Sequence, residues 1–472
     1  MIPDRFRPVL DDMAPLTQRF ADAGHRLYLV GGPVRDLLLG RPTAGVDLDA
    51  TTDARPAVIK RLLDGWADAI WSQGERFGTI GAKRGGITFE ITTHRAEAYR
   101  PESRKPDVAF ADAIEIDLSR RDFTVNAMAL ELTTATPSLV DPFGGATDLV
   151  TRTLRTPLSP EESFSDDPLR MLRAARFLSG YGLQPVPELV AAVRDMAPRL
   201  AIVSAERIRD EFDKLLTLDH PAAGLWFCID TGLTDQFFPE LSTMRLEQDP
   251  IHRHKDVLTH TLAVVENVRP DMKPDFDFRI TRLAALFHDI GKPRTRSVKA
   301  GKGVTFHHHE IVGARMTRNR LQELRYSNAD VEAITELVAL HLRFHTYQMG
   351  WTDAAVRRYV RDAGPLLPEL NVLTRCDCTT RNERKAAMLG RRMDELEVRI
   401  AELAAREELS KLRPELDGLQ VMELLGVKPG PVVGKALDML MEIRLEEGLL
   451  GDEQIRRRLD DWWAQHRPDA VS

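Results

Sequence analysis

Short apolar runs alternate with longer amphipathic periods over the first 150 residues of the chain. An apolar run at 26–32 ends in two glycines, and 34–40 has the spacing of a helix that stops at a glycine. Other segments carry the residue types and the alternation that are typical of β-strands. Strands are predicted at 46–52, 79–84, 87–95 and 123–132. This part of the chain is therefore predicted to mix helices with a β-sheet.

Strand patterns nearly disappear after residue 145, and helical periods dominate the rest of the chain. Near the C-terminus the helical pattern is interrupted at 428–431, where Lys-Pro-Gly-Pro cannot continue a helix. We predict an α+β protein in which a head is followed by three helical parts. The predicted parts are a head at 1–150, a neck at 151–250, a histidine-rich domain at 251–385 and a tail at 386–472.

Composition excludes several classes of protein. With 43% hydrophobic and 29% charged residues, the 472-residue chain can bury cores and is not disordered. Its net charge of -7 argues against a generally basic nucleic-acid coat protein, although a local basic stripe is enough to hold phosphates. Three cysteines, no apolar N-terminal region and no long apolar window predict a cytoplasmic protein without a membrane segment.

Two carboxylates in the predicted strand 46–52 are the first candidate chemistry. Asp47 and Asp49 are two residues apart, so their side chains share one face of the strand. Paired carboxylates suit Mg²⁺, and two such ions can serve the attacking and the leaving oxygen of a displacement at phosphorus. The same spacing also occurs in surface turns and caps, so the pair alone leaves both interpretations open.

Two glycines before a predicted helix are the second feature of the head. Gly31 and Gly32 would let backbone N–H groups approach a phosphate, and Arg35 follows directly. A glycine turn beside a surface ion pair would explain the same residues.

Three sequence blocks occur in the order seen in a known family. They are GGPVRDLLLGRPTAGVDLDATT at 31–52, RRDFTVNAMA at 120–129 and DDPLRMLRAARF at 166–177. Together they resemble the nucleotidyltransferase superfamily, specifically class II tRNA nucleotidyltransferases and bacterial poly(A) polymerases. Asp166 departs from the pattern, because glutamate is the more usual residue there. The resemblance implies a head built on a mixed β-sheet.

The resemblance also implies roles for individual residues. Asp47 and Asp49 would be catalytic and bind Mg²⁺. The nucleotide-binding residues would be Gly31, Gly32, Arg35, Arg120, Arg121, Asp122, Asn126, Asp167, Arg170, Arg173 and Arg176. A charge cluster at a strand edge, or plain helix capping by Asp167, would be the structural alternative. The three arginines of the third block share roughly one helix face.

The implied base-reading pair agrees with hydrogen-bond chemistry. The Asp167 carboxylate only accepts hydrogen bonds, and the Arg170 guanidinium only donates them. Cytosine and adenine both present an amino donor beside a ring-nitrogen acceptor, whereas uracil and guanine reverse this order. A mismatch leaves buried polar groups unpaired, at a cost of roughly 1–3 kcal/mol each. The pair therefore suits CTP and ATP.

Glu90, in the predicted strand 87–95, is a candidate third carboxylate near the metal ions. Alternation along the strand turns Glu90 to the face opposite Ile91. Glutamates in strands are often simply exposed, so its role stays open.

Nine of the 13 histidines lie between residues 252 and 345. His288-Asp289 ends an apolar helical segment, and the order of the surrounding residues resembles the HD phosphohydrolase superfamily. The resemblance implies a first metal ion on His260, His288, Asp289 and Asp377, and a second that uses His309 and His341. Imidazole with carboxylate suits Ni²⁺, Mn²⁺ or Mg²⁺, and such a centre could activate water against a phosphate ester. Core histidines in a relic domain are the alternative.

We therefore expect an enzyme that adds CMP and AMP to the tRNA 3′ end from CTP and ATP. The tail resembles that of tRNA nucleotidyltransferases with HD domains, which favours tRNA as the partner over messenger RNA, DNA or a membrane. A monomer or a homodimer would fit. The alternatives are a poly(A) polymerase, a partial enzyme that adds only CC or only A, an HD phosphohydrolase with a nucleotide-binding head, and a noncatalytic tRNA-binding protein.

Overall fold

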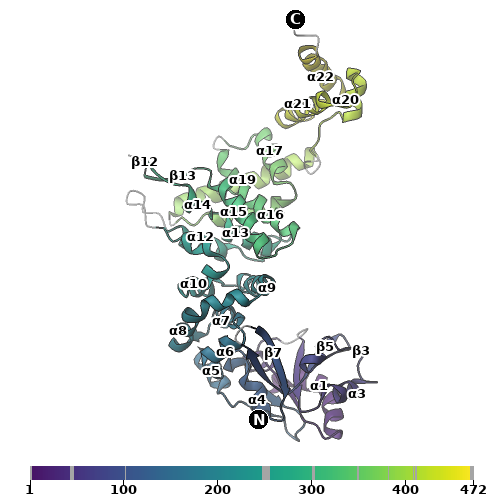
Figure 1. Cartoon of the computed structure of the whole chain (residues 1–472). Helices are drawn as coiled ribbons and strands as arrows, with labels where there is room; N and C mark the ends of the chain where they lie inside the picture. The colour runs from purple at the N-terminus through teal and green to yellow at the C-terminus, as the bar shows by residue number, and fades with distance from the viewer. Residues whose placement is uncertain are drawn as a thin grey trace. The chain divides into compact units, whose positions relative to one another are not determined.

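The computed structural model describes residues 3–42, 47–100, 103–246, 256–299, 303–347, 350–380, 382–407, 409 and 412–467. The chain forms two compact units, one from Met1–Ser242 with Glu323–Arg325 and one from Thr243–Gln322 with Tyr326–Ser472 (Figure 1). Val46 of the first predicted strand and the predicted boundary at 250/251 lie outside the described residues.

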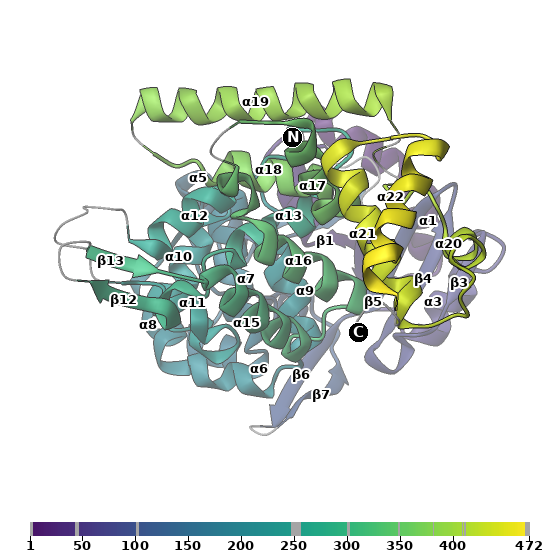
Figure 2. The same cartoon turned by 90° about the horizontal axis from the view of Figure 1, so that it is seen from above.

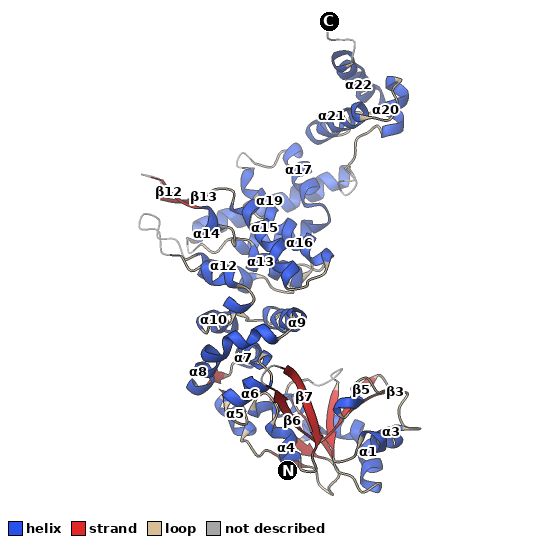
Figure 3. Cartoon of the chain, in the orientation of Figure 1, coloured by secondary structure: helices blue, strands red, loops and turns tan. Residues whose placement is uncertain are grey.

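The head is built on a seven-stranded mixed sheet with the order β3-β4-β5-β2-β1-β8-β9. Its strands are β1 (Leu27–Val30), β2 (Leu48–Thr52), β3 (Ala69–Trp71), β4 (Thr79–Arg84), β5 (Ile87–Thr93), β8 (Ala129–Glu131) and β9 (Ser138–Val140). Strands β2 and β5 are parallel, and every other pair in this sheet is antiparallel. A separate antiparallel pair is formed by β6 (Arg95–Arg100) and β7 (Ser103–Phe110). The predicted α+β class is confirmed, with the seven-stranded sheet in the head and a mainly helical remainder (Figure 3).

Helices of the head bury apolar faces against this sheet. They are α1 (Arg7–Asp22), α2 (Gly32–Leu38), α3 (Pro56–Leu63) and α4 (Ile114–Ser119), while α5 (Gly145–Thr151) packs on the turn Thr124–Asn126 and on Thr153–Leu154. In α1, the side chains of Val9, Met13, Leu16 and Phe20 recur at helical spacing and are all buried. Helix α2 starts two residues earlier than the predicted helix at 34–40.

The predicted strand at 123–132 is wrong over most of its length. Only Ala129–Glu131 is a strand, and Thr124–Asn126 forms a 3₁₀ turn. The Asp122 carboxylate accepts hydrogen bonds from the backbone N–H of Phe123 and from the side chain of Asn126, both at 2.9 Å. These local side-chain bonds offer the backbone an alternative to the strand ladder, although the apolar pattern favours a strand.

The neck is helical and belongs to the same compact unit as the head. Its helices are α6 (Pro160–Asp166), α7 (Leu169–Tyr181), α8 (Pro187–Met196), α9 (Ala205–Leu216), α10 (Ala222–Asp230) and α11 (Pro239–Thr243). A short parallel bridge pairs β10 (Thr153–Leu154) with β11 (Gln184–Pro185). Helix α7 packs against α9 and α10 and buries the apolar face that its sequence predicts, including Met171, Leu172 and Phe177.

The second unit begins with a bundle around α13. Its helices are α12 (Val257–Asn267), α13 (Phe278–Phe287), α14 (Lys292–Thr295), α15 (His309–Glu323), α16 (Asn328–Leu340), α17 (Asp353–Ala363), α18 (Leu367–Asp377) and α19 (Glu383–Arg406). A hairpin joins β12 (Arg296–Lys299) to β13 (Gly303–Phe306). Helix α13 is buried almost throughout and packs on α12, α16 and α18.

Helix α19 is one uninterrupted element of 24 residues (Figure 2). The predicted boundary at 385/386 falls in its first turn, so the four-part division stays a prediction. The tail adds α20 (Gly418–Leu425), α21 (Pro431–Glu447) and α22 (Asp452–His466), which share a small apolar core. The predicted helix break is confirmed, because α20 ends at the left-handed Gly426 and α21 begins at Pro431.

Among the described residues, no helix is both long enough and apolar enough to cross a bilayer.

Candidate functional site

The head contains a cavity of about 260 Å³ beside the turn between β1 and α2. It is lined by Gly31, Gly32, Arg35, Asp49, Arg121, Asp122, Asn126, Arg173, Arg176 and Phe177. Apart from Phe177, each lining residue belongs to the set predicted from the sequence. Within the described residues, Asp47, Arg120, Asp167 and Arg170 from that set are not part of this lining.

Carboxylates gather at one end of this cavity. Asp49 lies in β2 with a half-buried side chain, and Asp47, just before the strand, is exposed. Glu90 of β5 is the register partner of Asp49. Burial raises the pKa of Asp49 to about 6; Glu90 and Asp47 act in the same direction, and Arg121 opposes them. Such a group of carboxylates attracts a cation.

The buried Asp117 of α4 organises two of the predicted arginines. Its Oδ1 accepts from Arg120 at 2.6 Å, and its Oδ2 accepts from Arg121 at 3.2 Å. Burial alone would raise the pKa of Asp117, but Arg120 and Arg121 hold it below its usual value. Sequence reasoning missed this residue. The available signal was its spacing three and four residues before the arginines, a spacing at which side chains meet on a helix.

Asp122 is a second buried carboxylate that, like Asp117, holds predicted residues in place, and we call both of them braces. Asp122 connects three more predicted residues. Its Oδ2 accepts from Arg173 of α7 at 2.5 and 2.9 Å, and its Oδ1 accepts from Asn126 at 2.9 Å. Asn126 in turn accepts from Arg35 at 2.5 Å. Burial opposes ionisation, but Arg173 and Asn126 keep the pKa of Asp122 far below its usual value. This carboxylate therefore connects the turn Thr124–Asn126 and helix α2 of the head to helix α7 of the neck.

Neighbouring side chains fix the position of Arg35 and restrict which residue can occupy position 31. The Arg35 guanidinium donates to Asp36 through two bonds of 2.9 Å and stacks on Tyr181, with 4.2 Å to the ring centroid. Gly31 has a φ of 71°, and a Cβ there would lie 3.0 Å from the Arg121 guanidinium. Glycine is needed at that position because it tolerates this backbone and leaves room for the arginine.

Of the predicted base-reading pair, Asp167 lies between α6 and α7, and Arg170 lies in the first turn of α7. Asp167 accepts from Arg207 at 2.7 Å and also from the backbone N–H of Leu169 at 3.2 Å. Arg170 is buried and donates to Ser163 Oγ at 2.9 Å and to the Arg120 carbonyl at 2.5 Å. Arg207 and Ser163 were not predicted from the sequence. Arg207 lies 40 residues after Asp167, and Ser163 lies on α6, seven residues before Arg170, so both bonds depend on how the helices pack.

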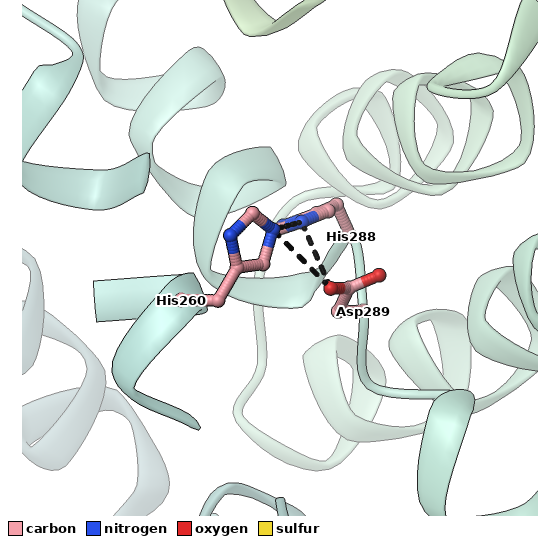
Figure 4. Close-up of side chains that lie close together, drawn as sticks. All are labelled: His260, His288 and Asp289. Carbon is pink, nitrogen blue, oxygen red and sulfur yellow. Dashed lines mark hydrogen bonds and ion pairs between the residues drawn. The ribbon is translucent and has the colours of Figure 1, made fainter. Parts of the chain in front are cut away.

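All six predicted histidine and aspartate ligands of the second unit lie at one place. They come from the middle or the ends of five helices: His260, His288, Asp289, His309, His341 and Asp377. Two groups have ligand atoms within 4.8 Å of one another, namely His260, His288 and Asp289 (Figure 4), and Asp289, His309 and His341. Asp377 joins the first group, with its Oδ1 2.9 Å from His260 Nε2. Asp289 is shared by both groups.

Backbone carbonyls orient the imidazoles of this cluster. The Nδ1 atoms of His288, His309 and His341 lie 2.7–2.8 Å from the backbone carbonyls of Ala285, Phe306 and Val338. A carbonyl only accepts hydrogen bonds, so each Nδ1 carries a hydrogen, and each ring in its neutral form keeps a lone pair on Nε2. This arrangement is the usual support for a metal-binding histidine.

The Nε2 atoms of the cluster face one another. His309 Nε2 lies 3.2 Å from His341 Nε2, and His288 Nε2 lies 3.3 Å from His260 Nε2. Burial lowers the pKa of His341 to about 3, so this imidazole stays neutral. Two nitrogen atoms at this distance need a proton or a metal ion between them, because two bare lone pairs would repel each other. The donor set therefore fits divalent metal ions.

Lys292 is a further polar residue at this cluster. Its ammonium lies 2.6 Å from Asp289 Oδ2, in α14 directly after the His-Asp pair. Burial raises the pKa of Asp289, but His288 and Lys292 hold it well below the usual value. Asp289 is thus ionised and can serve both groups. Lys292 was not predicted, although its spacing of three residues from Asp289 was visible.

The two sites define a nucleotidyltransferase head joined to an HD domain, and comparison with known proteins gives the same division. Family models match in chain order: "Poly A polymerase head domain" at 27–155, "Probable RNA and SrmB- binding site of polymerase A" at 182–244 and "HD domain" at 257–404. Both kinds of domain use divalent metal ions.

Relatives match this chain over different lengths. An A-adding tRNA nucleotidyltransferase of Deinococcus radiodurans is 35% identical over 450 residues, which are 93% of this chain and 96% of the relative. A CCA-adding enzyme of Lactobacillus helveticus is 38% identical over 233 residues, which are 49% of this chain and 56% of the relative. This chain therefore belongs to the family of tRNA nucleotidyltransferases and poly(A) polymerases, and it is a nucleotidyltransferase.

Solved structures share its fold. The Bacillus stearothermophilus CCA-adding enzyme in complex with CTP superposes with a TM-score of 0.68 at 24% identity, covering 98% of each chain. The Thermotoga maritima CCA-adding enzyme complexed with tRNA(CCA) superposes with a TM-score of 0.61 at 19% identity, covering 97% of each chain.

Proposed function

We propose that this enzyme adds CMP and AMP to the 3′ end of tRNA from CTP and ATP and releases pyrophosphate. The observation that carries the proposal is the head cavity, where Asp49 lies beside four arginines and a glycine turn. A triphosphate needs cationic partners, and the hydroxyl that attacks it needs metal-binding carboxylates close by. The family to which the chain belongs supports tRNA as the RNA substrate. The proposed location is the cytoplasm, because three free cysteines suit a reducing compartment.

Asp47 and Asp49 are the proposed ligands of Mg²⁺ in the head, with Glu90 as a third carboxylate. The ions, when bound, neutralise charge on the triphosphate and on the departing pyrophosphate. Arg121, Arg173 and Arg176 face the cavity and hold the phosphates electrostatically. The 3′ oxygen of the RNA forms the new bond to the α-phosphorus while the bond to the β-phosphate oxygen breaks.

Asp167 and Arg170 are the proposed readers of the base. Asp167 accepts from the amino group of cytosine or adenine, and Arg170 donates to the neighbouring ring nitrogen. To reach a base they must exchange part of their present bonding to Arg207 and Ser163. Arg120 connects this pair to the buried Asp117, because the carbonyl of Arg120 accepts a hydrogen bond from Arg170 and its side chain donates to Asp117.

A second candidate function is the addition of A alone. The Deinococcus radiodurans relative that matches 93% of this chain is an A-adding enzyme, whereas the Lactobacillus helveticus CCA-adding enzyme matches 49%. The two functions are separated with tRNA transcripts that end before, within and after CCA, each supplied with one nucleoside triphosphate. CMP incorporation supports the first proposal. AMP incorporation onto a transcript ending in CC, without any CMP incorporation, supports the second.

In the second unit, we propose that His260, His288, Asp289 and Asp377 hold one divalent ion, and that Asp289, His309 and His341 hold another. Ni²⁺, Mn²⁺ and Mg²⁺ are the candidates. Such ions, when bound, polarise a phosphate ester and lower the pKa of water. Lys292 and the helix-end carbonyls hold the ligands in place. Hydrolysis of 2′,3′-cyclic nucleotides with added Ni²⁺ or Mn²⁺ tests the proposal. A protein that binds none of these ions and hydrolyses none of these esters when they are supplied contradicts it.

A further inference from the structure

A second cavity, of about 280 Å³, lies in the HD domain beside Asp377. Its walls come from η6, the 3₁₀ turn Arg343–Thr346, from the end of α18 and from the N-terminal half of α19. The lining residues are Phe344, His345, Thr374, Arg375, Asp377, Cys378, Ala386, Leu389, Gly390 and Met393. Asp377 is the residue that connects this cavity to the proposed metal ligands, through its contact with His260.

Helix α19 presents an apolar face to the cavity, with a glycine at its centre. Ala386, Leu389, Gly390 and Met393 recur at helical spacing, so they share one side of the helix. Gly390 lies well inside a helix of 24 residues, where glycine is less favourable than alanine. A Cβ at this position would meet nothing within 4 Å. The glycine therefore leaves open a volume that any larger side chain would occupy.

Several polar groups around the cavity are already engaged with protein partners. The Thr374 hydroxyl donates to the Leu370 carbonyl at 2.8 Å. The Arg375 guanidinium lies 2.9 Å from Asp394 and 3.4 Å from Glu397. The side of the cavity formed by α19 therefore offers mainly apolar contacts, while the Asp377 end carries charge. A small site that is mostly apolar, with few polar groups at one end, is the usual form of a ligand pocket.

We propose that this cavity binds the organic group of a phosphate ester whose phosphate lies at the proposed metal ligands. This inference rests on the proposed function of the HD domain and adds its substrate class: phosphate esters with an apolar or aromatic group, in preference to small polar ones. Gly390 is then a specificity-determining residue, because a side chain there would fill the space of the organic group.

The test compares binding of two probes that share a phosphonate and differ in the organic group. Phenylphosphonate and methylphosphonate are titrated into the metal-loaded full chain, and neither needs to be hydrolysed. We expect phenylphosphonate to bind at least tenfold more tightly, and Gly390→Leu to remove most of this difference. Gly390→Ala, a milder change, should remove part of it. Equal binding of the two probes by the unmodified protein would overturn the inference.

Gly434→Leu is the matched control, because Gly434 lies exposed in α21 and a Cβ there would also meet nothing within 4 Å. It should leave the preference for phenylphosphonate unchanged, and all three variants should retain nucleotidyl transfer by the head as a check of folding. Hydrolysis of p-nitrophenyl phosphate and of glycerol phosphate is measured in parallel. A preference in binding without hydrolysis would refute the proposed phosphohydrolase activity and leave the cavity inference standing. Hydrolysis together with equal binding of the two phosphonates would refute the cavity inference and support the phosphohydrolase activity.

Discussion

The head and the HD domain both bring carboxylates together with cationic or metal-binding groups. They differ in which of these groups the rest of the protein holds in place: those that would meet metal ions or those that would meet anions. In the HD domain the proposed metal-binding groups are held in place, because backbone carbonyls fix the imidazoles with their Nε2 atoms turned inward. In the head the groups held in place are those that would meet anions, because Asp117 and Asp122 hold arginines around the cavity. Asp47, Asp49 and Glu90 do not bring three carboxylate oxygens within 4.8 Å of one another.

This difference suggests how each site is used. A cluster of imidazoles and buried carboxylates suits an ion that stays with the protein. Loosely grouped carboxylates suit Mg²⁺, which keeps part of its coordination for water and for the phosphates of a substrate. The head would then complete its metal sites together with the nucleotide, and the HD domain would hold its ions before any substrate arrives. Each of the following changes should affect one site and spare the other.

The largest effect is expected from replacing both head carboxylates, as Asp47→Asn with Asp49→Asn. Nucleotide incorporation should fall by roughly 10³-fold or more, because the charge that holds the metal ions is lost. Metal content of the HD domain, measured by mass spectrometry, should not change. Asp64→Asn, on an exposed residue at the end of α3, is the control and should retain activity. Full incorporation by the double variant would contradict the assignment of these carboxylates.

His341→Leu should affect only the HD domain. It removes one ligand of the group formed by Asp289, His309 and His341, so we expect metal content to fall from two ions per chain to one. Nucleotide incorporation should persist. The control is His307→Leu, on an exposed histidine close to His309 in the chain. Two ions per chain in the His341 variant would show that this group is not a metal site.

Much of the HD cluster could be predicted from the sequence, because its ligands lie in a recognisable order along the chain. His288 and Asp289 lie at the end of α13. The glycine and the proline that follow Asp289 already indicated that a helix ends there. The braces of the head were harder to predict. Asp117 has no motif of its own, and Arg207 meets Asp167 only through packing of the neck. Gly390 had no signal except its place inside a helical pattern.

The strand predicted at 123–132 shows a second limit. Its apolar residues are indeed buried, but the polar residues among them decide the backbone. Asp122, Thr124 and Asn126 each bond a side chain or backbone group near the turn. A strand pattern cannot reveal such bonds, since they depend on partners such as Asp148 of α5.

Asp117→Asn tests the brace in the head and should have an intermediate effect. Two arginines lose their buried counter-charge, which we expect to lower the free energy of unfolding by roughly 3 kcal/mol and to raise the KM for both CTP and ATP. Chemical denaturation and steady-state kinetics measure the two effects. Asp112→Asn is the control, because that carboxylate is 89% exposed. If KM stayed the same while stability fell, Asp117 would have only a structural role.

The smallest effect concerns the pH dependence of that brace. The pKa of Asp117 is lower in the folded protein than the roughly 3.9 of a free aspartate. Its contribution to stability is therefore complete above about pH 4 and is lost as the pH falls through the folded value. The stability difference between the unmodified protein and Asp117→Asn should shrink as the pH is lowered below about 4. A difference that does not change with pH would mean that this carboxyl does not ionise differently on folding.

The proposed function is tested most directly at the RNA product itself. A tRNA transcript that lacks its last three nucleotides is incubated with the enzyme, Mg²⁺, CTP and ATP, and its 3′ ends are sequenced. We predict that C, C and A are added in that order and that addition then stops. Ends without any added C, or open-ended A tails on this and unrelated RNA, would contradict the account.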